Sequence, residues 1–217
     1  VSRDWSSDVC SSDLTYRPLK LILPEGTLLS ASPTAAMALY PMPFPTVIDV
    51  IIKALEGVLP ERVTGAHFGS YSSLRLLGRR DNGALWSCND SGHGGWGACS
   101  DHDGAGPFRT MAHGDTRIIP VELQEALYPI RIEEFALRQD CGGAGKYRGG
   151  MGFRKRYRIL SACEMFANLD RIACPPWGVR GGHSASPGRI TIEKAGGGTE
   201  TLYKDRKSTR LNSSHVK

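Results

Sequence analysis

The segment DCGGAGKYRGGMGF, from Asp140 to Phe153, combines six glycines with two basic residues, a composition typical of loops that bind phosphate or another anion. The phosphate-binding template GxxxxGK[ST] requires a glycine at its head and a hydroxyl residue after its lysine. Asp140 and Tyr147 occupy those two positions here. An arginine-rich stretch also follows where this template and the dinucleotide template GxGxxG need a helix. Neither nucleotide-binding template is therefore satisfied.

The glycines of this segment have a structural interpretation as well. They predict tight turns with positive φ and close backbone approach between strands. The basic residues around them are then expected to face solvent or to meet acidic groups of a partner: Lys146, Arg148, Arg154 and Arg156.

A second loop, His93 to Gly106, carries side chains of the kinds that bind divalent metals. His93, Asp101 and Asp103 are the candidate metal ligands, with Asp90 and His102 nearby. Their spacing does not show that they converge. Asx turns in a solvated loop are the alternative interpretation.

Cysteine thiols are the candidate nucleophiles. The chain has 6 cysteines without a CxxC pair or zinc-finger spacing, which predicts reduced thiols and a cytoplasmic location. Cys163 and Cys174 fall in or near apolar stretches and are expected to be packed and inert, whereas Cys141 lies within the glycine segment. No spacing pairs a cysteine with one of the candidate bases, which are His67, His93, His102 and His113.

Composition narrows the class of protein. With 217 residues, 40% hydrophobic and 23% charged, the chain can bury a core in one or two domains. No apolar window is long enough to span a membrane, and the start lacks a secretory pattern. The net charge of +5 is modest and, apart from the run Arg148 to Arg158, scattered along the chain, so nucleic acid is not an expected partner.

The two ends of the chain differ from its interior. Residues 1–14 (VSRDWSSDVCSSDL) and 205–217 (DRKSTRLNSSHVK) are polar, serine-rich and without periodicity. A coding string for DWSSDVCSSDL, read as its reverse complement in a shifted frame, encodes DRKSTRLNSS. We therefore expect both ends to be disordered, translated sequencing adapter around residues 15–204, a fragment truncated at both sides.

The interior predicts an α+β fold, with helix in the N-terminal half and mainly antiparallel β structure with glycine-rich loops in the C-terminal half. The clearest helix begins at Thr46, a capping residue, has Asp49 in its first turn and stops at Pro60. Its apolar residues recur at helical spacing and are expected to form a core face: Val47, Ile48, Ile51, Leu55, Val58 and Leu59.

Strands are predicted by alternation of apolar and polar residues and by flanking turns. A short strand at Leu19 to Leu23 should close at the turn Pro24-Glu25-Gly26. Further strands are expected at 84–88, 130–137, 153–159, 163–169 and 189–192, with a short helical turn at 120–126 and an irregular loop at 89–107.

Three segments together resemble the hydantoinase B/oxoprolinase family, which includes N-methylhydantoinase B, the C-terminal portion of 5-oxoprolinase and the large subunits of acetone and acetophenone carboxylases. They are HGGWGACSDHDG, the stretch from IIPVELQEALYP to DCGGAGKYRGGMGFRKRY, and PPWGVRGGHSASPGR. The motif P-V-E-x-x-E-x-x-Y-P followed by D-x-G-G-A-G-K-Y-R-G-G-x-G is the most specific. PEGTLLSASPTAA is similar to an earlier family segment, so the resemblance covers nearly all of 15–204. Cys141 stands where the family usually has serine, and Asp115 near a position often held by asparagine.

The resemblance implies a fragment of a bacterial-type, multi-subunit hydrolase that opens a cyclic amide such as a hydantoin or 5-oxoproline. A hydantoinase A-like subunit or domain would bind ATP and phosphorylate the lactam oxygen, and water would then attack the ring. The carboxylase branch implies phosphorylation of a ketone and bicarbonate instead. A third interpretation is a non-catalytic module that docks the ATP-binding partner.

Family members are considerably longer than this chain. The resemblance therefore implies that a divalent metal would be held mainly by an N-terminal part, and that the fragment alone is inactive. Hydantoinase, oxoprolinase and carboxylase activities are not separated by the sequence.

Both chemistries place an anionic, phosphorylated intermediate between subunits. The resemblance implies that Gly142, Gly143 and Gly145 offer backbone N–H groups to this charge, with Lys146 and Arg148 beside them. Two further candidate catalytic residues, Glu122 and Glu125, share one face of a helical turn. They could act as acid, base or metal ligand, and surface salt bridging is the alternative.

Overall fold

The computed structural model describes residues 22–35, 43–69, 71–113, 116–194, 196–202, 206–211 and 215–216. The chain divides into two compact units, Val1–Tyr40 and Pro41–Lys217. In the first unit, Gly26 donates its backbone N–H to the carbonyl of Ser30, within the turn predicted at Pro24-Glu25-Gly26. Ile22 and Leu23 lie in no strand, and the rest of the strand predicted there, residues 19–21, is outside the described residues.

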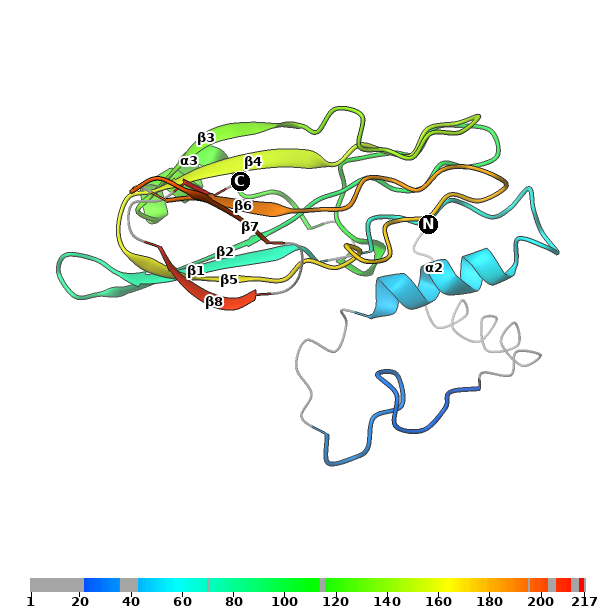
Figure 1. Cartoon of the computed structure of the whole chain (residues 1–217), viewed down its shortest axis with the longest axis horizontal. Helices are drawn as coiled ribbons and strands as arrows, with labels where there is room; N and C mark the ends of the chain where they lie inside the picture. Colours follow the sequence, from blue (N-terminus) through cyan, green and yellow to red (C-terminus); the bar gives the residue numbers. More distant parts are fainter. Residues whose placement is uncertain are drawn as a thin grey trace, which may run out of the picture. The chain divides into compact units, whose positions relative to one another are not determined.

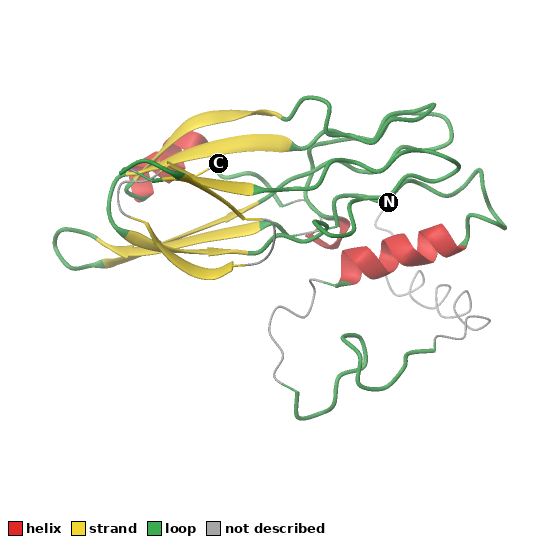
Figure 2. Ribbon diagram, viewed as in Figure 1, coloured by secondary structure: helices red, strands yellow, loops and turns green. Residues whose placement is uncertain are grey.

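In the second unit, the described strands form two antiparallel sheets that face each other as a sandwich (Figures 1 and 2). The first has the order β2-β1-β5-β8, with β1 Ser73–Arg79, β2 Leu85–Ser91, β5 Cys163–Ala167 and β8 Arg206–Leu211. The second has the order β3-β4-β9-β6-β7, with β3 Ile130–Leu137, β4 Phe153–Ile159, β6 Ile190–Glu193, β7 Thr199–Leu202 and β9 His215–Val216. The predicted α+β class is confirmed.

Among the described residues, three helical elements accompany the sheets: α2 Phe44–Ala54, α3 Val121–Leu127 and the 3-10 turn η1 Met111–His113. Long irregular loops leave the strands at one end of the sandwich, opposite the end that carries α3 (Figure 2). Among the helices that the structure describes, none is long and apolar enough to cross a membrane.

The hydrophobic core lies between the two sheets. Leu76 and Met165, from the first sheet, are 1% and 0% exposed, and Ile159 and Ile192, from the second, are each 1% exposed. Inward residues alternate with outward ones along the strands, as in β4, where the buried Tyr157 and Ile159 flank the exposed Arg158. Burial of this apolar surface is the main force that holds the sheets together.

The C-terminal end differs from its prediction. Residues 206–211 pair with β5 and residues 215–216 pair with β4 and β6, so part of the tail expected to be disordered forms strands. A sheet edge offers unpaired backbone N–H and C=O groups that any extended segment can satisfy, whatever its side chains. The adapter origin of both ends stays a prediction, and residues 1–14 lie outside the described residues.

The predicted helix is present as α2, but its orientation contradicts the expected core face. It begins at Phe44 instead of at a Thr46 cap, and no side-chain hydrogen bond caps it. Asp49 is buried, whereas Ile51 and Leu55 are 50% and 42% exposed. The helix turns its carboxylate inward because Arg171 and His67 bind Asp49 there.

The basic residues of β4 find acidic partners on the neighbouring strand of the same sheet. Arg154 and Arg156 lie 3.3 Å and 3.4 Å from the Glu134 carboxylate, and Arg158 lies 2.6 Å from that of Glu133. For Arg154 and Arg156, β3 therefore supplies an acidic group in place of the expected solvent or partner, and it supplies one for Arg158 as well.

An ion pair between the sheets connects β2 to β4. The buried Lys155 ammonium donates to Asp90 Oδ2 at 2.5 Å and to Gln124 Oε1 at 2.8 Å, and the Tyr157 hydroxyl donates to Asp90 Oδ2 at 2.6 Å. Burial acts to raise the pKa of Asp90, but the Lys155 charge and these hydrogen bonds outweigh it and lower that pKa. Burial, together with the same carboxylate, holds the pKa of Tyr157 well above its usual value.

Replacing Lys155 by Ala is expected to lower the unfolding free energy by about 3–5 kcal/mol, because the Asp90 carboxylate stays between the sheets without its cation.

Since the folded pKa of Asp90 is lowered, its stabilising contribution is present above the unfolded value of about 4 and is lost as pH falls through the folded value. Urea denaturation at pH 7 and at lower pH should therefore show the gap between wild type and Asp90→Asn narrowing on acidification. Asp81→Asn, in an exposed turn, is the matched control, and a Lys155→Ala protein as stable as wild type would contradict this account.

Candidate functional site

A cavity of about 660 Å³ is lined by residues of three irregular loops and of the strand ends beside them. We call these loop A (residues 92–107), loop B (140–152) and loop C (175–189). The cavity lining carries more basic than acidic side chains: Arg138, Lys146, Arg154, Lys155, Arg171, Arg180 and Arg189 against Glu61, Asp90 and Asp170. Four of these cations form ion pairs: Arg154 with Glu134, Lys155 with Asp90, Arg171 with Asp49 and Arg180 with Glu61. The surplus of basic groups that remains at this concave surface attracts anions.

The three loops pack through glycine backbones with no side chain between them. A Cβ atom at Gly95 would lie 1.8 Å from the Gly150 carbonyl oxygen, and one at Gly143 would lie 2.2 Å from the His183 carbonyl oxygen. Backbone hydrogen bonds join the loops at the same places, such as Gly150 to Trp96 and His183 to Ala144. Any larger residue at Gly95 or Gly143 would force the loops apart.

Close approach, and not positive φ, accounts for the glycines of loop B. Every residue of loop B is described, and the one positive φ in it belongs to Asp140, at 51°. The predicted close backbone approach is confirmed, whereas the predicted positive-φ turns at these glycines are wrong. Asp140 is among the residue types that adopt this conformation most readily.

The candidate anion-binding residues of loop B are only partly brought together. Gly143, Gly145 and Lys146 line the cavity, whereas Gly142 and Arg148 are not among the lining residues that the structure describes. Gly142 is closed off because its Cα faces the Gly149 carbonyl oxygen, where a Cβ would lie 2.0 Å away. The Arg148 side chain is exposed, and its backbone N–H donates to Asp103.

The candidate acid and base of helix α3 lie away from the cavity lining. Glu125 accepts a hydrogen bond from the backbone N–H of Ile132 at 2.7 Å, which fastens α3 to β3. Glu122 is exposed in the first turn of α3, where its charge suits the helix dipole. Neither carboxylate is placed to meet a ligand in the cavity.

The candidate metal ligands are not gathered into one site. His93 lines the cavity, Asp101 pairs with the exposed His102 at 2.6 Å, and Asp103 accepts from Arg148 at 2.8 Å. Within the described parts of the chain, no group of three or more His, Cys, Asp or Glu side chains could hold a metal ion. Burial and the Arg109 charge lower the pKa of His93 below its usual value, which favours the neutral ring.

Three of the described cysteines, Cys88, Cys141 and Cys163, are buried. Burial raises the pKa of Cys88 and of Cys163 to about 11 in each case, with Asp90 adding to the shift at Cys88. Cys141 is buried, donates to the Arg138 carbonyl and accepts from the Gly152 N–H, each at 3.0 Å. Cys174 is exposed, which contradicts its predicted packing.

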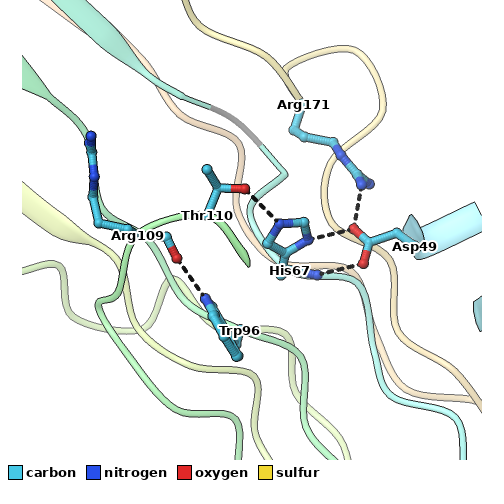
Figure 3. Close-up of polar contacts among 6 residues, drawn as sticks. All are labelled: Asp49, His67, Trp96, Arg109, Thr110 and Arg171. Carbon is cyan, nitrogen blue, oxygen red and sulfur yellow. Dashed lines mark hydrogen bonds and ion pairs between the residues drawn. The ribbon is translucent and has the colours of Figure 1, made fainter. Parts of the chain in front are cut away.

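A buried polar network beside the cavity was missed by the sequence analysis (Figure 3). Asp49 Oδ2 lies 2.8 Å from His67 Nδ1 and accepts from Arg171 Nη2 at 2.5 Å. His67 Nε2 lies 3.2 Å from the hydroxyl of Thr110. All four residues are at most 9% exposed, and Arg171 alone of them lines the cavity. No local pattern marks this network, since Asp49 and Arg171 are 122 positions apart.

The fold and the cavity together define an α+β sandwich domain whose glycine loops surround a basic ligand-sized cavity. The profile of the family Hydantoinase B/oxoprolinase matches residues 6–216. The chain belongs to this family, as its motifs indicate.

Similar proteins support this membership. The chain is 37% identical over 194 residues to an uncharacterized protein of Methanocaldococcus jannaschii, covering 87% of this chain and 33% of that protein. It is 29% identical over 177 residues to a putative D-/L-hydantoinase subunit of a Pseudomonas species, covering 81% of this chain and 29% of that protein. It is 35% identical over 157 residues to the beta subunit of caprolactamase from Pseudomonas jessenii, covering 64% and 25%. The chain thus spans a third or less of these relatives.

Two solved structures share the fold. The crystal structure of ATP-dependent caprolactamase from Pseudomonas jessenii matches with a TM-score of 0.74 at 24% identity, covering 90% of this chain and 35% of that one. The nucleotide-free structure of acetone carboxylase matches with a TM-score of 0.60 at 19% identity, covering 74% and 26%.

The packing of loop B gives a test that needs no ligand. Gly142→Ala is expected to destabilise the protein by about 1–3 kcal/mol or more, because its Cβ would overlap the Gly149 carbonyl. Gly152→Ala is the matched control, since its Cβ would meet Cys141 Sγ at an ordinary 3.7 Å. Thermal and urea unfolding of both variants measure the difference, and equal stabilities would show that close approach does not constrain this loop.

Proposed function

We propose that this chain is part of one subunit in an ATP-dependent enzyme that opens a cyclic amide, such as a hydantoin, 5-oxoproline or a caprolactam. Membership of the hydantoinase B/oxoprolinase family supports this, together with relatives named as a hydantoinase subunit and a caprolactamase subunit. Because those two relatives are named as subunits, the proposal includes a partner. We assign ATP binding to that partner, which we propose to be hydantoinase A-like.

The observation that carries the proposal is the basic cavity enclosed by the glycine loops. Phosphorylation of the lactam oxygen would create an anion, and its stabilisation by fixed positive charges and dipoles is the largest contribution that such a site can make. Lys146 supplies an exposed ammonium at the cavity, and Gly143 and Gly145 supply backbone of the same loop. We therefore keep these three residues as the proposed anion contacts.

The remaining candidates have different roles in the proposal. Arg148 fixes loop B to loop A through its backbone bond to Asp103, and Glu125 fixes α3 to β3. His93, Asp101 and Asp103 do not fit a metal ion, so no step of the proposed reaction is routed through a metal at these residues. The described cysteines are free thiols, which suits the proposed cytoplasmic location.

A carboxylase that phosphorylates a ketone and bicarbonate is the second candidate. The backbone likeness to acetone carboxylase favours it, although at 19% identity this likeness concerns the fold alone. The cyclic amide hydrolase is preferred because the relatives named for that chemistry are the more similar in sequence. Docking of the ATP-binding partner is a third candidate, supported by the exposed apolar side chains of α2.

The test uses a complete family member that carries this sequence, purified with its ATP-binding partner. ADP release should depend on a cyclic amide and not on acetone with bicarbonate. Lys146→Met is expected to lower kcat/KM for ring opening by about tenfold or more, because it removes a charge that faces the anion. Lys194→Met, at an exposed ion pair with Glu200, is the matched control.

Size-exclusion chromatography separates chemistry from docking in the same experiment. An intact complex with lost turnover in Lys146→Met would support the chemical role, and loss of the complex would support docking. ADP release that no cyclic amide stimulates would contradict the proposed function. The 217-residue chain alone is expected to open no ring.

A further inference from the structure

Arg171 is a buried cation whose hydrogen-bonding capacity is only partly used. Its side chain is 5% exposed, and its Nη2 donates to Asp49 Oδ2. Its Nε and Nη1 are buried and have no hydrogen-bond partner in the described parts of the chain. Buried donors without acceptors are strongly unfavourable, so a native structure that keeps them has a use for them.

The surroundings of Arg171 hold its guanidinium in one place. Asp49, which binds it, is itself fixed by the ring of His67, and His67 also contacts Thr110 (Figure 3). Arg171 has a φ of 57°, an unusual conformation for a residue other than glycine. Strained backbone of this kind persists where the surrounding structure enforces it, and it is concentrated at functional sites.

The indole N–H of Trp177 is a further unpaired donor close to the Arg171 guanidinium. The Arg171 guanidinium lies 4.5 Å from the centroid of the Trp177 ring, a cation–π contact. The indole Nε1 is buried and, among the described residues, has no hydrogen-bond partner. Both side chains line the cavity. Two residues that border the cavity therefore hold three donor nitrogens without an acceptor, Arg171 Nε, Arg171 Nη1 and Trp177 Nε1, and one fixed positive charge.

We propose that Arg171 and Trp177 form an oxyanion subsite, in which a carboxylate or phosphate oxygen accepts from one unpaired guanidinium donor, Arg171 Nε or Nη1, and from the indole N–H. Acceptor oxygens with negative charge are the groups that guanidinium donors bind most strongly. The proposal rests on the proposed function for the identity of the ligand, a reactant or product of ring opening, but not for binding itself. The subsite lies on loop C and the segment before it, whereas Lys146 lies on loop B.

Binding to the 217-residue chain tests the subsite without turnover. The probes for isothermal titration calorimetry are 5-oxoproline, 2-pyrrolidinone, which is the same ring without the carboxylate, and inorganic phosphate. We expect 5-oxoproline or phosphate to bind and 2-pyrrolidinone to bind more weakly. Binding of 5-oxoproline alone identifies a carboxylate, and binding of phosphate identifies a phosphate group. The proposal is overturned if neither 5-oxoproline nor phosphate binds. It is also overturned if 2-pyrrolidinone binds as well as 5-oxoproline does and phosphate does not bind.

Arg171→Lys keeps a cation near Asp49 but loses the guanidinium donors. We expect it to weaken binding of the oxyanion by about tenfold or more, because charge-assisted hydrogen bonds are lost. Arg79→Lys, at the exposed end of β1, should bind as wild type does. Unchanged affinity in a folded Arg171→Lys protein would overturn the proposal.

A second variant decides the question if Arg171→Lys does not fold. Gly69 has a φ of +62°, and a Cβ there would lie 2.5 Å from Arg171 Nε, so Gly69→Ala displaces the guanidinium without changing it. Gly83→Ala is the matched control, since its φ is +82° and nothing lies within 4 Å of its Cβ. Oxyanion binding should weaken in Gly69→Ala and not in Gly83→Ala, and equal binding by the two would overturn the proposal.

These outcomes are independent of the proposed reaction. A complete complex that opens no cyclic amide would remove the proposed function. The Arg171 subsite would still stand if its variants lose oxyanion binding.

Discussion

The close approach of backbone to backbone across the glycine loops is the constraint on which the cavity depends. Side chains normally separate neighbouring segments, but at Gly95, Gly97 and Gly143 a carbonyl oxygen of another segment occupies the space of the absent Cβ. Hydrogen bonds between these segments satisfy backbone groups that no helix or sheet could pair. Loops A, B and C therefore behave as a packed layer, although they contain no regular secondary structure.

The same packing carries the buried polar network to the cavity. The Ala66 backbone N–H donates to the Trp177 carbonyl of loop C, and the Gly65 N–H donates to the Ala98 carbonyl of loop A. The segment that bears His67 is therefore held between two loops. Asp49 then joins α2 to this segment through His67. Arg171 completes the network from the other side. A shift of one loop would thus move a charged group that lies far from it in sequence.

The sequence predicts local structure well and long-range choices poorly. Strands at 130–137 and 153–159 follow from alternation that reflects burial on one face, and the structure has them at these bounds. Which face of α2 is buried could not be predicted from its sequence. The local pattern shows an apolar stripe and a single acidic residue, Asp49, whereas the buried face is determined by the ion pair of Asp49 with the distant Arg171. Loop glycines also look alike in sequence whether they serve positive φ or close approach. The candidate metal ligands His93, Asp101 and Asp103 lie apart in the structure, since ligand types in one loop need not converge.

Hydrogen–deuterium exchange at the backbone amides of the loops tests the packed layer most directly. Gly150 donates to Trp96, Trp96 donates to Ala105 and Gly104 donates to Arg148, with N–O distances of 2.7–2.9 Å. If the loops form one cooperative layer, these amides should be protected about as strongly as those of β1 and β5 and should exchange together. Exchange at the rate of exposed turns, with the strands still protected, would contradict the claim that glycine packing builds the cavity.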